Sequence, residues 1–179
     1  MRTLTNSLAA GALFVTIGCT AGIDSGAFVS RSVDFNRYRT YNWAATPRPQ
    51  DDPRLQANAS FKDHFEGEVE KQLAAKGLEG PQTRRPDLLV RYRAAVTQRT
   101  EVTGVESGYG YCSFDCVEHT AEYEKATFII DVVDARTQKI VWRGWASDDL
   151  EGILKDEDRM ERRVREAVAQ MMAKLPAKL

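Results

Sequence analysis

The chain has 179 residues, which suits one domain, and its formal net charge is -1. Because 25 basic side chains are balanced by 26 acidic ones, no strong field attracts nucleic acid or an acidic membrane, and we expect no nucleic-acid partner. A composition of 42% hydrophobic and 28% charged residues is that of an ordinary globular protein.

The N-terminus has the order of a secretory signal. Arg2 and the amino group precede an uninterrupted run of apolar and small residues, LAAGALFVTI, at positions 8–17. As a helix this run would be ~15 Å long, about half of a ~30 Å hydrocarbon core, so a permanent membrane span is not expected. We interpret residues 1–18 as a lipoprotein-type signal peptide.

Gly18 and Cys19 follow this run and resemble a bacterial lipobox, in which the cysteine is diacylated and becomes the new N-terminus. Thr16 departs from the motif, where Leu is usual. Two alternatives stay open: ordinary secretion with cleavage after Ala21, and a buried cysteine in a structural helix. In the lipoprotein interpretation, the absence of Asp at Thr20 resembles outer-membrane sorting, with the domain facing the periplasm.

The next segments predict a tether, a strand and a helix. Residues 19–32, the lipidated cysteine and a small, polar stretch without a sustained period, are expected to be a flexible tether. The second half of 33–43 alternates as a strand does. A helix is predicted over Pro53–Lys76, because Asp52 can cap its start and Gly77 can take the left-handed conformation that ends it.

Three strands and a final helix complete the predicted domain. Residues 86–100 and 122–134 alternate in hydrophobicity, and 139–146 returns after a short turn. The last helix runs over about Asp156–Leu175. We therefore expect a single α+β domain over 33–179, a two-layer sandwich with a mainly antiparallel sheet of about four strands, two helices on one face and the order β-α-β-β-β-α.

The pairing of the last two strands can be predicted from their faces. Val132 opposite Trp142 places both on the core side, and the same register sets Asp131 opposite Arg143 on the outer side. This register requires a five-residue loop or a bulge. The basic side chains of the first long strand are expected to form a solvated face paired with Asp131 and neighbouring acids: Arg91, Arg93 and Arg99.

Two cysteines, Cys112 and Cys116, lie in a glycine- and aromatic-rich loop. We expect a disulfide, because cysteines beyond the inner membrane tend to be oxidised, and closing this loop would stabilise the fold by ~2 kcal/mol. Two free thiols are one alternative. Another is a metal site formed by Cys112, Cys116 and His119 with a fourth ligand from Asp115 or His64. The CxxxC spacing is not the CxxC of thioredoxin-like sites.

The aromatic residues of this loop have two interpretations. Tyr109, Tyr111 and Phe114 either fold onto the sheet or form an exposed patch for a partner or glycan. Trp145 lies on the opposite strand face from Trp142 and is a candidate surface contact. No GxSxG, HExxH, P-loop or GxGxxG motif is present, so no catalytic residues and no cofactor are predicted.

Five stretches of the chain resemble the bacterial family catalogued as domain of unknown function 4136. They are DFNRYRTYNW at 34–43, KQLAAKGLE at 71–79, PDLLVRY at 86–92, TFIIDVVDARTQKIVWRGWAS at 127–147 and REAVAQMMAKLP at 165–176. The resemblance spans about 34–176 and implies an envelope lipoprotein, with a glycine- and aromatic-rich insertion at 104–116. It implies no activity and no catalytic residues.

These features together predict a noncatalytic, lipid-anchored envelope protein that serves as a periplasmic scaffold or accessory binding module. Its expected partners are the membrane, through acylated Cys19, and an envelope protein or a glycan. Two other classes stay open: a metal- or thiol-dependent enzyme using Cys112, Cys116 and His119, and a glycan- or peptidoglycan-binding module using Tyr109, Tyr111 and Trp145.

Overall fold

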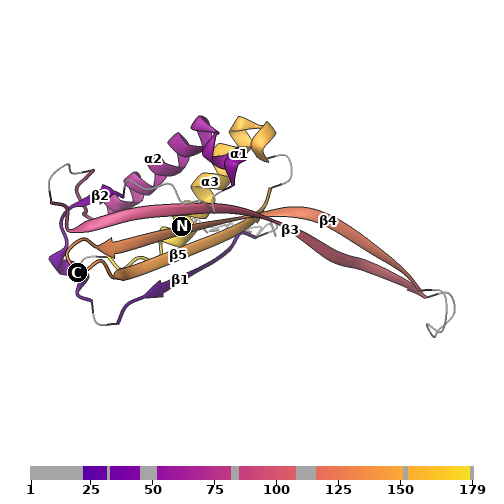
Figure 1. Ribbon diagram of the computed structural model, residues 1–179, viewed down its shortest axis with the longest axis horizontal. Helices are drawn as coiled ribbons and strands as arrows, with labels where there is room; N and C mark the ends of the chain where they lie inside the picture. Colours follow the sequence, from indigo (N-terminus) through magenta and orange to yellow (C-terminus); the bar gives the residue numbers. More distant parts are fainter. Residues whose placement is uncertain are drawn as a thin grey trace, which may run out of the picture.

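The structure is a computed structural model of an α+β domain with a helical layer on one face of a sheet (Figure 1). It describes residues 22–31, 33–44, 52–81, 85–107, 116–150 and 153–177. Within these residues there are five strands and three α-helices. In chain order the elements are β1 (Asp24–Val29), η1 (Phe35–Arg37), β2 (Tyr41–Trp43), α1 (Pro53–Gln56), α2 (Ala59–Ala75), β3 (Leu88–Ser107), β4 (Cys116–Asp134), β5 (Ile140–Asp149), η2 (Ile153–Lys155) and α3 (Glu157–Met172).

The five strands form one mixed sheet in the order β1-β5-β4-β3-β2. All neighbours are antiparallel except β2 and β3, which are parallel. The predicted class and the mainly antiparallel character are therefore confirmed. The predicted count of about four strands and the order β-α-β-β-β-α are wrong in detail, because they omit β1.

β1 corrects the expectation of a flexible tether. Residues 24–29 pair with β5 from Asp24 opposite Ser147 to Val29 opposite Trp142, so this part of 19–32 is sheet. Ile23, just before the strand, is 9% exposed and belongs to the core. The sequence DSGAFV is short and does not alternate between apolar and polar residues, so it did not predict a strand. Edge strands are often short in this way.

The predicted register of β4 and β5 is confirmed. Val132 lies opposite Trp142 and Asp131 opposite Arg143, and a bulge follows between Val132 and Val133. Trp142 is fully buried, and its indole lies over Gly144, where an added Cβ would stand 2.3 Å from Trp142 Cη2. The bulge supplies the extra residue that the register required.

The predicted helix over Pro53–Lys76 is interrupted. α1 is capped by Asp52, whose side chain accepts from the Arg54 backbone N–H, and α2 has its own cap at Asn58, which accepts from the Phe61 N–H. Because Asn58 is extended, it separates the two helices. The predicted end is confirmed: Gly77 has φ 75°, and the Leu78 N–H donates to the Leu73 carbonyl at 3.1 Å.

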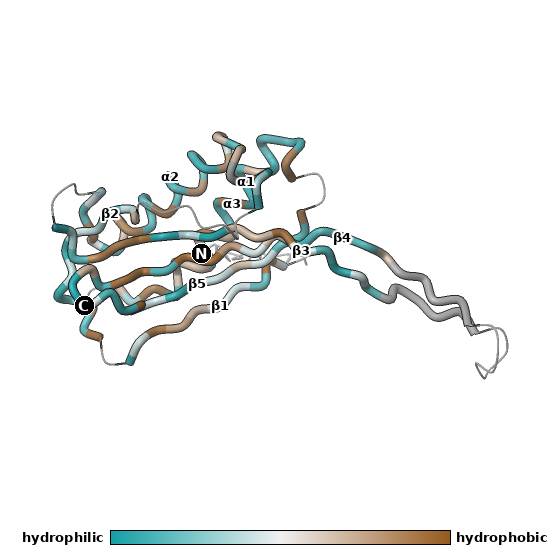
Figure 2. Tube along the Cα trace, viewed as in Figure 1, coloured by the Kyte–Doolittle hydropathy of each residue, from teal (hydrophilic) through white to brown (hydrophobic). Residues whose placement is uncertain are grey.

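The core lies between α2, α3 and one face of the sheet, where hydrophobic residues concentrate on the strands of the body (Figure 2). At its centre Phe65 is fully buried. Its ring centroid lies 4.7 Å from that of Tyr92, 5.6 Å from that of Phe61 and 5.7 Å from that of Phe128. This aromatic cluster ties the helical layer to β3 and β4, the two strands that continue beyond the body.

Candidate functional site

The most prominent feature is a two-stranded arm formed by the outer parts of β3 and β4 (Figure 1). β5 pairs with β4 only over Lys125–Val133, and β2 pairs with β3 only over Leu88–Val90. From Thr97 opposite Lys125 to Ser107 opposite Cys116, the two strands make ten residue pairs, and beyond Lys125, which also pairs with Asp149 of β5, no third described strand pairs with them. We call residues 97–107 and 116–125 the β-arm. At ~3.4 Å per residue it is about 34 Å long.

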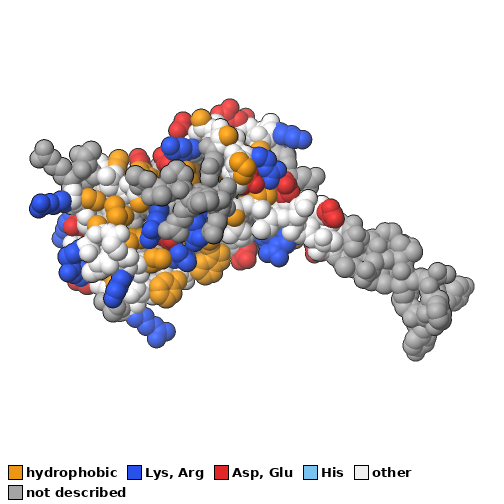
Figure 3. All heavy atoms as spheres, in the orientation of Figure 1, with side chains coloured by type: hydrophobic (Ala, Val, Ile, Leu, Met, Phe, Trp, Pro, Cys, Tyr) orange, Lys and Arg blue, Asp and Glu red, His pale blue; other side chains and the backbone are white. Residues whose placement is uncertain are grey.

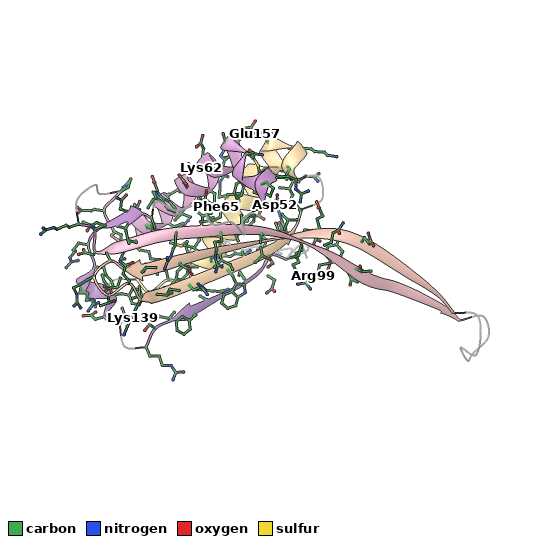
Figure 4. The ribbon with its side chains drawn as sticks, in the orientation of Figure 1. Asp52, Lys62, Phe65, Arg99, Lys139 and Glu157 are labelled. Atoms are coloured by element: carbon green, nitrogen blue, oxygen red, sulfur yellow. The ribbon has the colours of Figure 1, made fainter. Side chains whose placement is uncertain are left out.

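The root of the β-arm is exposed to solvent. All of residues 97–101 are exposed, and Arg99 lies where the arm leaves the body (Figure 4). The register shifts between Val102 and Gly104, which marks a bulge that increases local twist. A two-stranded ribbon is at best marginally stable in water by itself, and its unpaired edges are templates for another strand. The β-arm therefore has the form of an interaction element.

The sheet face opposite the helices, here called the outer face, carries a second exposed feature. Phe28 of β1 is 56% exposed and Trp145 of β5 is 37% exposed. The Trp145 indole lies over Gly26, where an added Cβ would stand 1.9 Å from Trp145 Cζ2. Hydrophobic side chains gather over β1 and β5 along this edge of the body (Figure 3). Trp145 is thus a surface residue, as its place on the strand predicted.

Charged residues on the outer face centre on Asp131, which is 2% exposed. Arg143 donates to both of its carboxylate oxygens, from Nε at 2.5 Å and from Nη2 at 2.9 Å. This hydrogen bond raises the pKa of Arg143. Arg91 Nε lies 3.9 Å from Asp131 Oδ2. The predicted pairing of the basic face with Asp131 is confirmed for Arg91. Arg99 lies farther out, at the root of the β-arm.

A polar cluster around Asp134 was not predicted. This carboxylate is 3% exposed and accepts from the Tyr38 hydroxyl at 2.9 Å and from the backbone N–H groups of Arg136 at 3.0 Å and Thr137 at 2.7 Å, and it also pairs with Arg37. Burial opposes ionisation, but these donors outweigh it and lower the pKa of Asp134 to about 2. The cluster locks the turn after β4 against the segment around η1.

An open cleft of about 250 Å³ adjoins this cluster. Its lining residues are Arg37, Tyr38, Pro86, Asp87, Asp134 and Arg136. Asp87 also has a structural partner, because its carboxylate accepts from the Arg39 and Thr40 backbone N–H groups at 2.7 and 3.0 Å. Both carboxylates thus hold the local backbone. An Asp directly before a turn, as in VVDARTQ, is the sequence signal that identifies such a cap.

The family model described as Domain of unknown function (DUF4136) matches residues 28–177, nearly the whole chain. The chain belongs to the DUF4136 family. The resemblance seen in the sequence is therefore confirmed. No curated protein matches the chain.

Two solved structures are similar to the chain. A PDZ domain protein from Parabacteroides distasonis is 19% identical, with a TM-score of 0.54 over 87% of this DUF4136 chain and 36% of that protein. The chain therefore spans about a third of the length of that protein, and the likeness shows a shared fold. A PelC dodecamer from Paraburkholderia phytofirmans is 10% identical, with a TM-score of 0.49 over 88% of this chain and 100% of that chain.

Of the predicted partner-binding and cysteine-site residues of this DUF4136 protein, the structure describes Cys116, His119 and Trp145, and Trp145 lies far along the sheet from the other two. Cys116 begins β4 and His119 pairs with Gly104, both in the β-arm. Trp145 is paired with Ile129, which is 13 residues or about 44 Å of strand from Cys116. The remaining predicted residues lie outside the described ones: Cys19, Tyr109, Tyr111, Cys112, Phe114 and Asp115. The disulfide and the acylation stay predictions.

His64 is a helix-layer residue rather than a neighbour of His119. It lies on α2, and its Nε2 is 3.9 Å from Glu157 Oε1 at the start of α3. In the described part of the chain, no group of three His, Cys, Asp or Glu side chains could hold a metal ion. Over the same residues, no helix is both long and apolar enough to cross a membrane.

Proposed function

We propose that this DUF4136 protein is a noncatalytic, lipid-anchored protein of the bacterial cell envelope. Its domain works in the periplasm as a scaffold or accessory binding module, and its anchor lies in the outer membrane. The observation that carries the binding role is the β-arm, which projects from the body of the domain and is contacted by other described elements only at its base, at Glu124 and Lys125.

The β-arm supports a protein partner in particular. Beyond Glu124 and Lys125, each of its strands has one edge without a described neighbour, and a partner strand can hydrogen-bond to such an edge. The exposed side chains of residues 97–101 add contacts specific to the partner. Because an isolated ribbon of this length is marginal in water, binding would also stabilise it. We therefore infer an envelope protein as the partner of the β-arm.

The anchoring role rests on the sequence around Cys19. The apolar run at 8–17 ends just before Gly18 and Cys19, which is the order of a lipoprotein signal. Intact mass of the protein extracted from its native membrane tests this role. A chain of residues 19–179 with acyl groups is the expected result, and an unacylated chain beginning at Gly22 would refute the anchor.

Site-specific photocrosslinking in cells tests the binding role. A photoreactive residue is placed at Thr100 on the β-arm, and a matched control is placed at Lys62, which is exposed on α2 in the helical layer (Figure 4). We expect a discrete crosslinked species from Thr100 and none from Lys62. Equal crosslinking at the two sites, or none at Thr100, would contradict a role of the β-arm in binding. The same experiment resolves the partner by mass.

The noncatalytic role has its own test. We expect the purified protein to show no turnover with ester, amide, phosphoester and glycoside substrates. Turnover that is lost when Asp134 is changed to Asn, while the circular dichroism spectrum is unchanged, would instead assign an activity to the cleft beside η1.

A further inference from the structure

The chain enters the fold very close to the proposed lipid anchor. Ile23 is fixed in the core, and β1 begins at Asp24. Only four residue steps separate Cys19 from Ile23, so the lipidated end can lie at most ~14 Å from this point. With so short a connection, the β1 edge of the sheet cannot move far from the membrane surface.

The surface beside this entry point has the side chains of a membrane interface. Phe28 is 56% exposed and Trp145 is 37% exposed, and they lie on the same face of the neighbouring strands β1 and β5. Figure 3 shows hydrophobic side chains over these two strands. An amphipathic indole is well suited to the headgroup level, and a partly buried phenyl ring gains apolar contact there.

The charges of the outer face are compatible with phospholipid headgroups. Asp131 is paired with Arg143 and lies 3.9 Å from Arg91 Nε, and the Nε atoms of Arg91 and Arg93 are buried without a hydrogen-bond acceptor in the described structure. Toward the β-arm the outer-face positions include Lys125, Asp149 and Asp24. Over the body of the domain, the outer face thus carries four cations and three anions, so electrostatic attraction to the membrane is small. The cations are Arg91, Arg93, Lys125 and Arg143, and the anions are Asp24, Asp131 and Asp149. The short connection and the aromatic side chains carry the contact.

From these observations we propose that the outer face along β1 and β5 lies on the phospholipid surface of the membrane that holds the anchor. The proposal rests on the proposed function, because it requires acylated Cys19. A lipid surface is favoured over a second copy of the chain, because a connection of ~14 Å holds this edge at the membrane whatever else the domain binds.

Quenching of tryptophan emission by brominated phospholipid tests the orientation. The full, acylated protein is reconstituted into vesicles of phosphatidylethanolamine and phosphatidylglycerol, with brominated or ordinary acyl chains. We expect brominated lipid to quench the wild-type emission and this quenching to be lost in Trp145→Phe. Of the two tryptophans that remain, Trp142 is buried in the core, and Trp43 lies on β2 at the opposite edge of the sheet, where its indole N–H donates to Glu70 Oε1 at 2.8 Å. The matched control is Trp145→Phe combined with Lys62→Trp, which moves the reporter to the helical layer and should restore no quenching.

The outcomes separate the orientation from the anchor. Protein that sediments with the vesicles but whose Trp145 emission is unaffected by brominated lipid would overturn the orientation and leave the anchor intact. Protein that remains in the supernatant would overturn both. Equal quenching of the reporters at positions 145 and 62 would also overturn the orientation. If Trp145 becomes shielded from acrylamide on raising the protein concentration in detergent without vesicles, a second copy covers the outer face and the proposal is wrong.

Discussion

Asp134 should make the stability of this protein depend on pH in a specific window. Its pKa in the folded protein is about 2, lowered from 3.8 by hydrogen bonds to its carboxylate. A group with a depressed pKa stabilises the fold above its unfolded pKa, and this contribution is lost as pH falls through the folded value. The window therefore runs from about pH 4 down to about pH 2. The difference of nearly two between the unfolded and folded pKa of Asp134 corresponds to about 2 kcal/mol of the free energy of unfolding at neutral pH.

The perturbation that isolates this contribution is Asp134→Asn, which keeps the shape of the side chain and removes its charge. We expect the variant to be less stable than the wild type by about 2 kcal/mol at neutral pH, and the difference to shrink toward pH 2. Urea unfolding followed by circular dichroism at a series of pH values measures it. Asp63→Asn, at an exposed position of α2, is the matched control and should leave the profile unchanged.

A second variant examines the cause of the shift. Tyr38→Phe removes the hydroxyl that donates to Asp134 at 2.9 Å. The loss of stability between pH 4 and pH 2 should therefore become smaller. It should not vanish, because the backbone N–H groups of Arg136 and Thr137 still donate to the carboxylate. A free-energy difference between wild type and Asp134→Asn that stays constant from pH 7 to pH 2 would refute the electrostatic reasoning. It would show that the asparagine acts by altered packing alone.

Three further substitutions test the packing. Phe65→Ala removes the buried ring at the centre of the aromatic cluster and should lower the free energy of unfolding by about 3–5 kcal/mol in urea. Gly144→Ala places a methyl group against the buried indole of Trp142 and should destabilise by about 1–3 kcal/mol, seen as a lower thermal midpoint. Gly67→Ala, with nothing within 4 Å of the added Cβ, should instead raise stability by about 0.5–1 kcal/mol; a loss there would contradict the helical assignment.

The parts of the fold that the sequence predicted are those with strong alternation or clear caps. Val132 and Asp131 point to opposite faces, and only one register sets them against Trp142 and Arg143 with matching chemistry. The end of α2 was equally predictable, because Gly77 is the residue that the left-handed φ of 75° requires. These signals are local in the chain or depend on a single pairing.

The parts that were missed depend on contacts between distant segments. β1 is held by β5, more than a hundred residues away, and the DSGAFV sequence does not itself encode a strand. The continuation of β3 to Ser107 and of β4 back to Cys116 depends on the pairing of two polar segments with each other. The cap at Asn58 was missed because the start signal of Asp52 and Pro53 precedes it and the apolar periodicity begins only after it, at Phe61. For the candidate site, the sequence identified Trp145 as a surface residue but could not show the β-arm.

The position of β1 relates the proposed anchor to the β-arm. Asp24 lies opposite Ser147, which in turn lies opposite Thr127, and the β-arm begins at Lys125, only two residues farther along β4. The chain thus enters the sheet near the base of the arm, whereas the Asp134 cluster lies at the other end of the body. If both proposals hold, the arm extends up to about 34 Å from a base that is kept close to the membrane. The short connection between Cys19 and Ile23 would then also restrict the partner of the β-arm to the part of the periplasm that lies next to the membrane.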